Sequence, residues 1–355
     1  MGLSIGEENA RYSKNAMALH RRLSSAAPLE SVFTIEPASR LDIVNVRPRL
    51  GQLLSRFSFV LLFSAHTTAG YLPQSITDRL SNAGISTREY IRAFQRLFPE
   101  GAGYRHDNLC ERSELSDAAK LTEPRNGDAH LIFVAAGLET CVVYEGRRRH
   151  PVYLIELDGT NRAARRKRLT HVIGFNNEQT LARARFNVLV RPNGYAVVNL
   201  KAKEVGLYEF ARGLIADREI EYGRLRLSLA PGERAAGLVV NEYERLLVDE
   251  DLTGFFRDPC LFERRRSGSS GPIATGCNSR VFHVIGDPVQ MADPQHSRWV
   301  DLGLSKSEIS VPIAPTGIPA RTGLLEGRYH CPMLYQWQKS PTYWRTLWLS
   351  VSRFY

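Results

Sequence analysis

The chain has little of several features that would assign a protein to a class at once. Across its 355 residues, no apolar run approaches the roughly 20 residues that a membrane span needs. Residues 1–9 are polar and partly acidic, unlike the basic and then apolar start of a signal peptide. The five cysteines are scattered and never form a Cys-x-x-Cys pair, which argues against a disulfide framework and a zinc ribbon. We therefore expect a cytoplasmic protein with no membrane partner.

Several catalytic motifs are missing as well. The sequence contains no Walker loop, no dinucleotide-binding glycine fingerprint, no Gly-x-Ser-x-Gly elbow and no His-Glu-x-x-His helix. Their absence argues against nucleotide hydrolysis, hydride transfer and serine-type hydrolysis.

The chain does have an excess of positive charge, with a net charge of +10 and a pI of about 9.5. Arginines gather in residues 147–149, 162–168 and 264–266, and such clusters attract phosphates, nucleic acids or acidic metabolites. Aromatic residues do not interleave with them as in proteins that bind single strands, so nucleic acid is not the favoured partner. The charge fits a small anionic metabolite, and a solvated arginine-rich surface is the alternative.

Three histidines stand in polar or small-residue turns. His66 begins a His-Thr-Thr-Ala-Gly run after an apolar strand, His106 ends Tyr-Arg-His, and His130 ends Asn-Gly-Asp-Ala-His. Neutral imidazoles suit zinc and other divalent first-row metals, and three of them leave a coordination position open. The pattern predicts a metal or phosphate site. The alternatives are that each ring is a satisfied turn residue or that the rings bind phosphate as cations.

Apolar and alternating runs predict the secondary structure. Ser86 and Glu89 form a capping box for a helix that Pro99 ends. Strands adjacent in the sequence usually pair antiparallel, so we expect an α+β fold with largely antiparallel sheets. The strands of the first half are predicted at residues 32–36, 57–64, 131–136, 139–144 and 152–157.

The second half of the chain repeats the order of the first half. Five pairs of segments match in the same order, which predicts a tandem duplication. The predicted units are a polar lead at 1–30, a first repeat at 31–182 and a diverged second repeat at 183–355. The matching pairs are 43–46 with 197–200, 57–64 with 224–229, 69–70 with 236–237, His130 with His296, and 145–147 with 326–328.

These motifs resemble the YjbQ family, also called secondary thiamine-phosphate synthases. The family pattern is a strand, His-Thr-Thr/Ser-Ala-Gly, Asn-Glu with Leu-Leu-x-Asp, Tyr-x-His, Asn-x-x-Ala-His, and Glu-x-Asp-Gly. The resemblance covers nearly the whole chain and implies two tandem YjbQ-like domains, each a largely antiparallel sheet sandwich with one or two helices. The first repeat carries the motifs at 66–70, 104–106, 126–130 and 156–159, and the second carries those at 241–242 and 246–249.

Each repeat alone departs from the family pattern. Gln74 and Ser75 replace Asn-Glu in the first repeat, which also has an insert at 111–124, and Glu233 replaces the first histidine in the second. Together the two repeats supply each type of catalytic-looking residue in the family pattern. The resemblance implies trimers with sites near subunit contacts, so we expect a homo-oligomer or a pseudo-symmetric assembly of repeats. Our hypothesis is a working site between unlike repeats.

Roles follow for individual residues. Glu242 is the candidate general base. The neighbouring Asn241 could position its carboxyl group, and the like charge of Asp249 could raise the pKa of that group. A capped helix start is the alternative for this pair. The expected metal ligands are His66, His106 and His130, with a second set of Glu233, His283 and His296. The residues expected to bind a phosphate or diphosphate are Arg105, Arg162, Thr67 and Thr68.

We therefore expect a metal-assisted enzyme with zinc, or manganese or iron, as its divalent cofactor. The resemblance implies a transfer like that of thiamine-phosphate synthase on a small phosphorylated or anionic metabolite. The changed motifs favour a diverged reaction, for example in a specialised biosynthetic pathway. The alternative is a noncatalytic ligand-binding or assembly protein in which duplication has eroded both sites.

Overall fold

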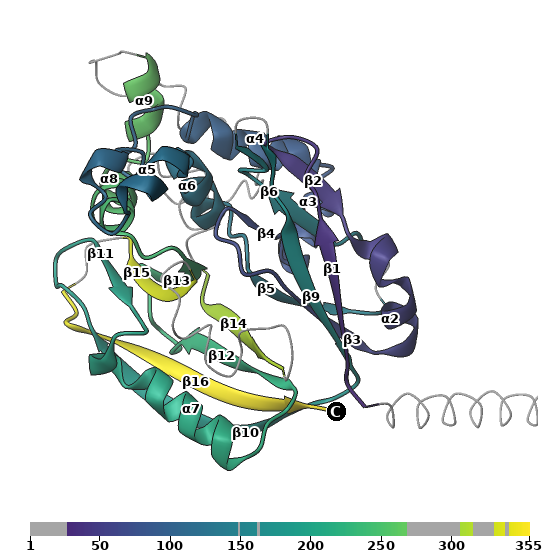
Figure 1. The fold of residues 1–355 in the computed structure, drawn as a ribbon. Helices are drawn as coiled ribbons and strands as arrows, with labels where there is room; N and C mark the ends of the chain where they lie inside the picture. The colour runs from purple at the N-terminus through teal and green to yellow at the C-terminus, as the bar shows by residue number, and fades with distance from the viewer. Residues whose placement is uncertain (1–26, 148–149, 162–163, 268–305, 315–329, 338–340) are drawn as a thin grey trace, which may run out of the picture.

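The structure, a computed structural model, describes residues 27–147, 150–161, 164–267, 306–314, 330–337 and 341–355. These residues form a mixed α/β molecule in which neighbouring strands of every sheet run antiparallel (Figure 1). The predicted α+β class with largely antiparallel sheets is confirmed. Within these residues, no helix has the length and apolar character that a membrane crossing requires.

The first half of the chain forms two main sheets. The four-stranded sheet has, in spatial order, β1 (Leu29–Ile35), β9 (Arg168–Phe175), β3 (Phe59–Phe63) and β5 (Cys141–Glu145). The three-stranded sheet places β6 (Tyr153–Glu156) between β2 (Asp42–Asn45) and β4 (Ala69–Tyr71). A small ribbon of β7 (Thr160–Asn161) and β8 (Ala164–Arg165) connects β6 to β9.

The second half has the same strand order. Its four-stranded sheet has β10 (Glu178–Leu189), β16 (Trp344–Phe354), β12 (Gly223–Leu229) and β14 (Glu308–Ile313). Its three-stranded sheet places β15 (Cys331–Gln336) between β11 (Ala196–Asn199) and β13 (Ala236–Asn241). The segments that match in the sequence at 43–46 and 197–200 fall on β2 and β11, which occupy equivalent places.

The first half carries more helices than the one or two that were expected. The predicted capping box is present: Ser86 Oγ accepts the N–H of Glu89 at 3.2 Å, and the Glu89 carboxylate accepts the N–H of Ser86 at 2.9 Å. The helices of the first half are α2 (Gly51–Arg56), α3 (Gln74–Asn82), α4 (Thr87–Leu97), α5 (Asp117–Thr122) and α6 (Gly127–Ala135). Those of the second half are α7 (Leu207–Asp217), the π-helix η4 (Leu246–Leu252), α8 (Thr253–Arg257) and α9 (Leu261–Ser267). Short 3-10 turns are η1 (Arg47–Leu50), η2 (Leu109–Glu111) and η3 (Lys203–Val205).

Residues 131–136 were predicted as a strand, and this prediction is wrong because they belong to α6 and its C-terminal end. Every residue of α6 is buried, so its apolar run lacks the one-sided pattern of a surface helix and resembles a buried strand. The helix begins at Gly127, whose N–H donates to Asp107 Oδ1 at 2.9 Å. That bond satisfies one of the first N–H groups, which no helical carbonyl reaches. The start of α6 is thus fixed by the loop that carries His106.

Apolar cores join the two halves. Strand β3 alternates its side chains, so Val60 and Leu62 pack in one core with β6 and α2. Leu61 and Phe63, on the opposite face, pack in a second core with β12, β13 and β16 of the other half. A third core contains α4 and α6 of the first half together with η4, α8 and α9 of the second, in the upper part of Figure 1. Two of these three cores therefore contain residues of both halves.

The cysteines follow the sequence prediction with one exception. Cys110, Cys141 and Cys331 are free thiols, whereas Cys260 is in a disulfide. The scattered spacing argued against a disulfide framework, and spacing alone does not reveal a single bridge.

Two alanine substitutions are expected to change stability in opposite directions. A Cβ on Gly223 would overlap the carbonyl oxygen of Ser352 in the neighbouring strand, so Gly223→Ala should lower the free energy of unfolding by about 1–3 kcal/mol. Gly213 is exposed on α7 with nothing near an added Cβ, so Gly213→Ala should raise it by about 1 kcal/mol. Urea unfolding followed by circular dichroism compares the two. A neutral Gly223→Ala would contradict the close pairing of β12 with β16.

Candidate functional site

Two histidines of the first half meet a carboxylate of the second half in a buried group. His106, His130 and Glu242 each offer one ligand atom, and these atoms lie within 4.8 Å of one another. His106 lies in the loop before η2, His130 lies on α6, and Glu242 directly follows β13. All three side chains are buried, with relative exposures of 1%, 2% and 4%. This group, the His–His–Glu group, is the candidate site.

Asn241 fixes the tautomer of His130. The Asn241 Nδ2 donates to the carbonyl of Thr67 at 3.2 Å, which turns its Oδ1 toward His130 Nδ1 at 2.8 Å. An amide oxygen only accepts, so the hydrogen-bond pattern assigns the proton to Nδ1 and leaves a lone pair on Nε2. Burial, and then the charge of His106, hold the pKa of His130 well below its usual value, so the ring is neutral. Its Nε2 lies 3.5 Å from Glu242 Oε2, a gap that a cation or a proton would bridge.

His106 is held through both ring nitrogens. Its Nδ1 lies 3.0 Å from Glu244 Oε2, and its Nε2 lies 3.3 Å from Asn126 Oδ1. Glu244 also accepts the N–H groups of Leu246 and Leu247 at 2.7 and 2.9 Å. Burial alone would raise the pKa of Glu244, but these hydrogen bonds outweigh it and lower the pKa. For His106, burial alone would lower the pKa. The hydrogen bond to Glu244 and the negative charge of Glu242 outweigh burial, so the pKa is raised.

Arg112 is a site residue that the sequence analysis missed. Its guanidinium is fully buried and donates to Glu242 Oε1 at 2.8 Å and to Glu114 Oε1 at 2.7 Å. Its Nη1 also lies 3.4 Å from His106 Nε2. Arg112 belongs to the insert at 111–124, which separates two histidine motifs. This place in the sequence was the signal that could have indicated a role for Arg112 in the site.

The pKa of Glu242 is raised, as expected, but from a different cause. Burial raises it, and the charges of His106 and Arg112 only partly offset burial. The expected like charge of Asp249 is not among the causes of the shift, and Asp249 is exposed on η4. Asp249 is therefore not a neighbour that tunes the candidate base.

Other expected site residues have partners elsewhere or lie outside the described residues. Glu233 pairs with Arg345 at 2.9 Å and accepts the N–H of Thr346, so its carboxylate is already neutralised. Arg105 is half-exposed and pairs with Glu111 and Glu250 at 2.5 and 2.8 Å. The residues outside the described part of the chain are Arg162, His283 and His296.

The His66 turn supports the His–His–Glu group without belonging to it. Thr67 offers its carbonyl to Asn241, and Thr68 Oγ1 accepts from Arg168 Nη2 at 3.2 Å. Burial, and then the charges of Arg168 and Arg166, lower the pKa of His66 to about 4. His66 was expected as the third histidine ligand, whereas the group among the described residues takes Glu242 in its place.

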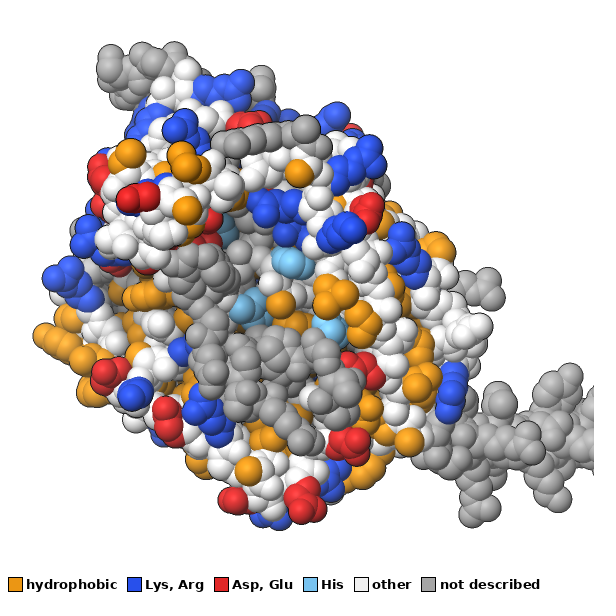
Figure 2. Space-filling view, in the orientation of Figure 1, with side chains coloured by type: hydrophobic (Ala, Val, Ile, Leu, Met, Phe, Trp, Pro, Cys, Tyr) orange, Lys and Arg blue, Asp and Glu red, His pale blue; other side chains and the backbone are white. Residues whose placement is uncertain are grey.

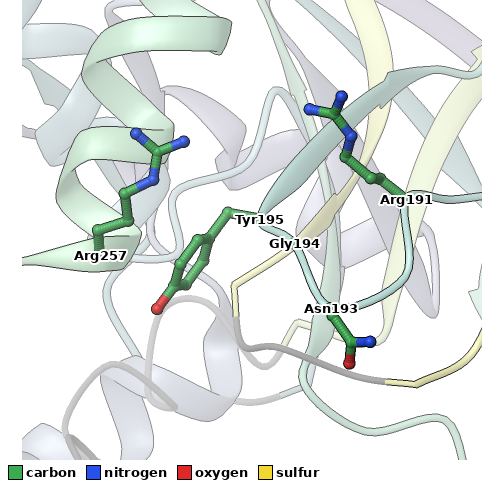
Figure 3. Close-up of a pocket in the computed structure, with 5 residues that line it drawn as sticks. All are labelled: Arg191, Asn193, Gly194, Tyr195 and Arg257. Carbon is green, nitrogen blue, oxygen red and sulfur yellow. The ribbon is translucent and has the colours of Figure 1, made fainter.

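Two polar features lie at the surface. Figure 2 shows histidine side chains in a hollow near the middle of one face, with cationic side chains beside them. A separate cavity of about 400 Å³ lies in the second half, where the Arg257 guanidinium lies 5.9 Å from the centre of the Tyr195 ring (Figure 3). This cavity is lined by Arg191, Asn193, Gly194, Tyr195 and Arg257, and it includes no member of the His–His–Glu group.

Comparisons with known proteins give matches among solved structures alone. No protein-family model and no curated protein matches the chain. A YbjQ-like protein of unknown function from Sulfolobus solfataricus P2 is 13% identical with a TM-score of 0.29, over 50% of this chain and 99% of that one. A hypothetical protein from Aeropyrum pernix K1 is 14% identical with a TM-score of 0.28, over 48% of this chain and 98% of that one. An uncharacterized conserved protein of the yjbq/upf0047 family from Clostridium acetobutylicum is 15% identical with a TM-score of 0.27, over 40% of this chain and 97% of that one.

Proposed function

We propose that the chain is a metal-assisted enzyme, built by tandem duplication of a YjbQ-like unit, whose working site lies between the two halves. The observation that carries the proposal is that His130 of the first half hydrogen-bonds Asn241 and faces Glu242 of the second. The common strand order of the halves supports the duplication and favours a boundary between β9 and β10, at residues 176–177.

The donor set fits a divalent metal. Two imidazoles and one carboxylate form a ligand set of catalytic zinc sites, which keep a further position open. A metal-binding histidine usually donates its other ring N–H to an oxygen, and His130 Nδ1 does so to Asn241. His106 Nδ1 is directed at Glu244 in the same way, and its Nε2, which lies 3.3 Å from Asn126 Oδ1, would give up its proton to bind a metal. Zinc suits this set, with manganese or iron as alternatives.

The residues of the chain have distinct roles in this proposal. A divalent ion supplies a Lewis acid that polarises an oxygen of a phosphoryl or carbonyl group. Glu242, predicted as a general base, instead becomes a ligand through Oε2, because Arg112 holds its Oε1 at 2.8 Å. Arg112 thereby orients the carboxylate and neutralises part of its charge. The net charge of +10 and the arginines beside His66 favour a small anionic or phosphorylated substrate.

Metal content tests the proposal with variants in opposite halves. The wild-type chain is expected to hold close to one divalent ion after dialysis. His130→Ala and Glu242→Gln should each weaken metal binding by more than about 100-fold, because each removes a ligand rather than a supporting contact. Elemental mass spectrometry of the purified proteins measures this. His150→Ala is the control, since His150 is an exposed histidine outside the group. Equal metal content in all four proteins, or none in the wild type, would argue against the site.

A noncatalytic role is the second candidate, and Arg112 is the observation that favours it. The buried guanidinium lies against both Glu242 and His106, where it can serve as a permanent cation. In this alternative, the His–His–Glu group ties the two halves together, and the protein binds a ligand or a partner without turning it over.

Replacing Arg112 by methionine separates the two candidates. Arg112→Met leaves Glu242 buried without its cation, which should cost about 3–5 kcal/mol of unfolding free energy. If the group binds a metal, added zinc supplies the missing charge and raises the melting temperature of the variant more than that of the wild type. Differential scanning fluorimetry with and without zinc measures both effects. The exposed Arg88→Met is the control. If zinc does not change the melting temperature of the variant, the noncatalytic role is favoured.

A further inference from the structure

Among the residues that the structure describes, one buried histidine outside the His–His–Glu group has no hydrogen-bond partner. His330 directly precedes β15, is 7% exposed, and has no hydrogen bond to either ring nitrogen. Its ring meets Phe63 of β3 edge-on, with 5.4 Å between the ring centres. A buried polar group without a partner costs about 1–3 kcal/mol, so such groups are rare and require an explanation.

Two further side chains of the first half offer nitrogen atoms nearby. The ring of His66 makes no hydrogen bond within the described residues, and its charge acts on His330. Arg166 Nε is buried without a partner, although Arg166 Nη2 donates to Asp158 Oδ2 at 2.5 Å. Three nitrogen-bearing side chains from segments far apart in the sequence thus come to the His66 turn, because His330 meets Phe63 just before the turn and Arg168, two residues after Arg166, donates to Thr68 within it.

The carboxylates of this region are already engaged. Asp158 accepts from Asn126 at 2.9 Å as well as from Arg166, and Glu156 holds Arg168 through two hydrogen bonds. Burial, and then the charges of Lys201 and His66, lower the pKa of His330 to about 3, so its ring is neutral. The region therefore offers N–H donors, and its carboxylates Asp158 and Glu156 are not free to accept from them.

We propose that His66, His330 and Arg166 form a phosphate-binding site that holds the anionic group of the substrate beside the His–His–Glu group. A phosphate has several acceptor oxygens and can take hydrogen bonds from separate directions, and arginine is well suited to bind it. The inference rests on the proposed function only in calling the ligand a substrate.

Arg166 connects this phosphate site to the His–His–Glu group. Its positive charge lowers the pKa of both His66 and His130. It also anchors Asp158, which holds Asn126, whose Oδ1 faces His106. A phosphate held by Arg166 would thus lie close to the bound metal and present the rest of the substrate to it.

Substitution of His330 by phenylalanine tests the site. His330→Phe keeps an aromatic ring against Phe63 and removes both unpartnered nitrogens. If His330 were only a packing residue, the variant would gain stability and bind phosphate like the wild type. In the proposed site it binds phosphate about 10- to 100-fold more weakly, the loss expected for one hydrogen bond to a charged group. His66→Phe should weaken binding to a similar extent, and the exposed His150→Phe should not change it.

The probe is inorganic phosphate, titrated by calorimetry into the full chain after removal of metal with a chelator, with melting temperatures recorded for every variant. Failure of the wild type to bind phosphate, or equal affinity in the wild type and both variants, overturns the phosphate site. Metal content of the same preparations, measured before the chelator is added, keeps the two proposals apart. A wild type that is purified with its metal but does not bind phosphate refutes the phosphate site alone. A wild type that is purified without metal but binds phosphate through His66 and His330 refutes the metal site alone.

Discussion

One buried amide, that of Asn241, holds the two halves in the register that the candidate site requires. The side chain has no exposed surface, accepts from His130 and from the N–H of Glu242, and donates to the carbonyl of Thr67. Leaving such a buried amide unpaired costs about 1–3 kcal/mol, so its partners in the first half strongly constrain where β13 lies. A shift of β13 by one residue would turn Asn241 to the other face of its sheet and break these contacts together. The position of Glu242 against His130 follows from this register.

Around Asn241 the first half supplies donors and the second half supplies carboxylates. The backbone N–H groups of Arg105 and His106 both donate to Asp251 at 2.9 Å, and the His106 ring is directed at Glu244. All the accepting carboxylates lie in the turn and the π-helix that follow β13. Buried charges are costly without partners, so each segment needs the other to remain folded. The apolar core that α6 shares with η4 packs on the same side and keeps water from these ion pairs.

The residues of the site that could be predicted are those within short contiguous motifs. His106, His130, Asn241 and Glu242 each stand in a motif of a few residues, so the resemblance identified their types and positions. The contacts of Arg112, Glu244 and Asp251 could not be read in this way, because their partners are 130 or more residues away in the chain. The α+β class followed from the apolar pattern, whereas the continuous apolar run of α6 carries no period that separates a buried helix from a buried strand. For His66 the motif gave the residue type but not the direction of the ring.

Two copies of one unit would contact each other at two equivalent places, one for each copy of the site. Among the described residues, one of these places has all the side chains of the candidate site. Gln74 stands where the second half has Asn241, and its Nε2 is buried without a partner. Glu233 stands where the first half has His66, and its carboxylate is bound by Arg345, which also donates to Gln336 Oε1 at 2.9 Å. An ion pair in this place binds the turn between β12 and β13 to β16 and engages the carboxylate of Glu233. In a duplicated chain the two copies can therefore diverge: one of the two places retains the groups that bind a ligand, and the other exchanges them for contacts that stabilise the fold. A single gene would then fix one site per chain, whatever number of chains assemble.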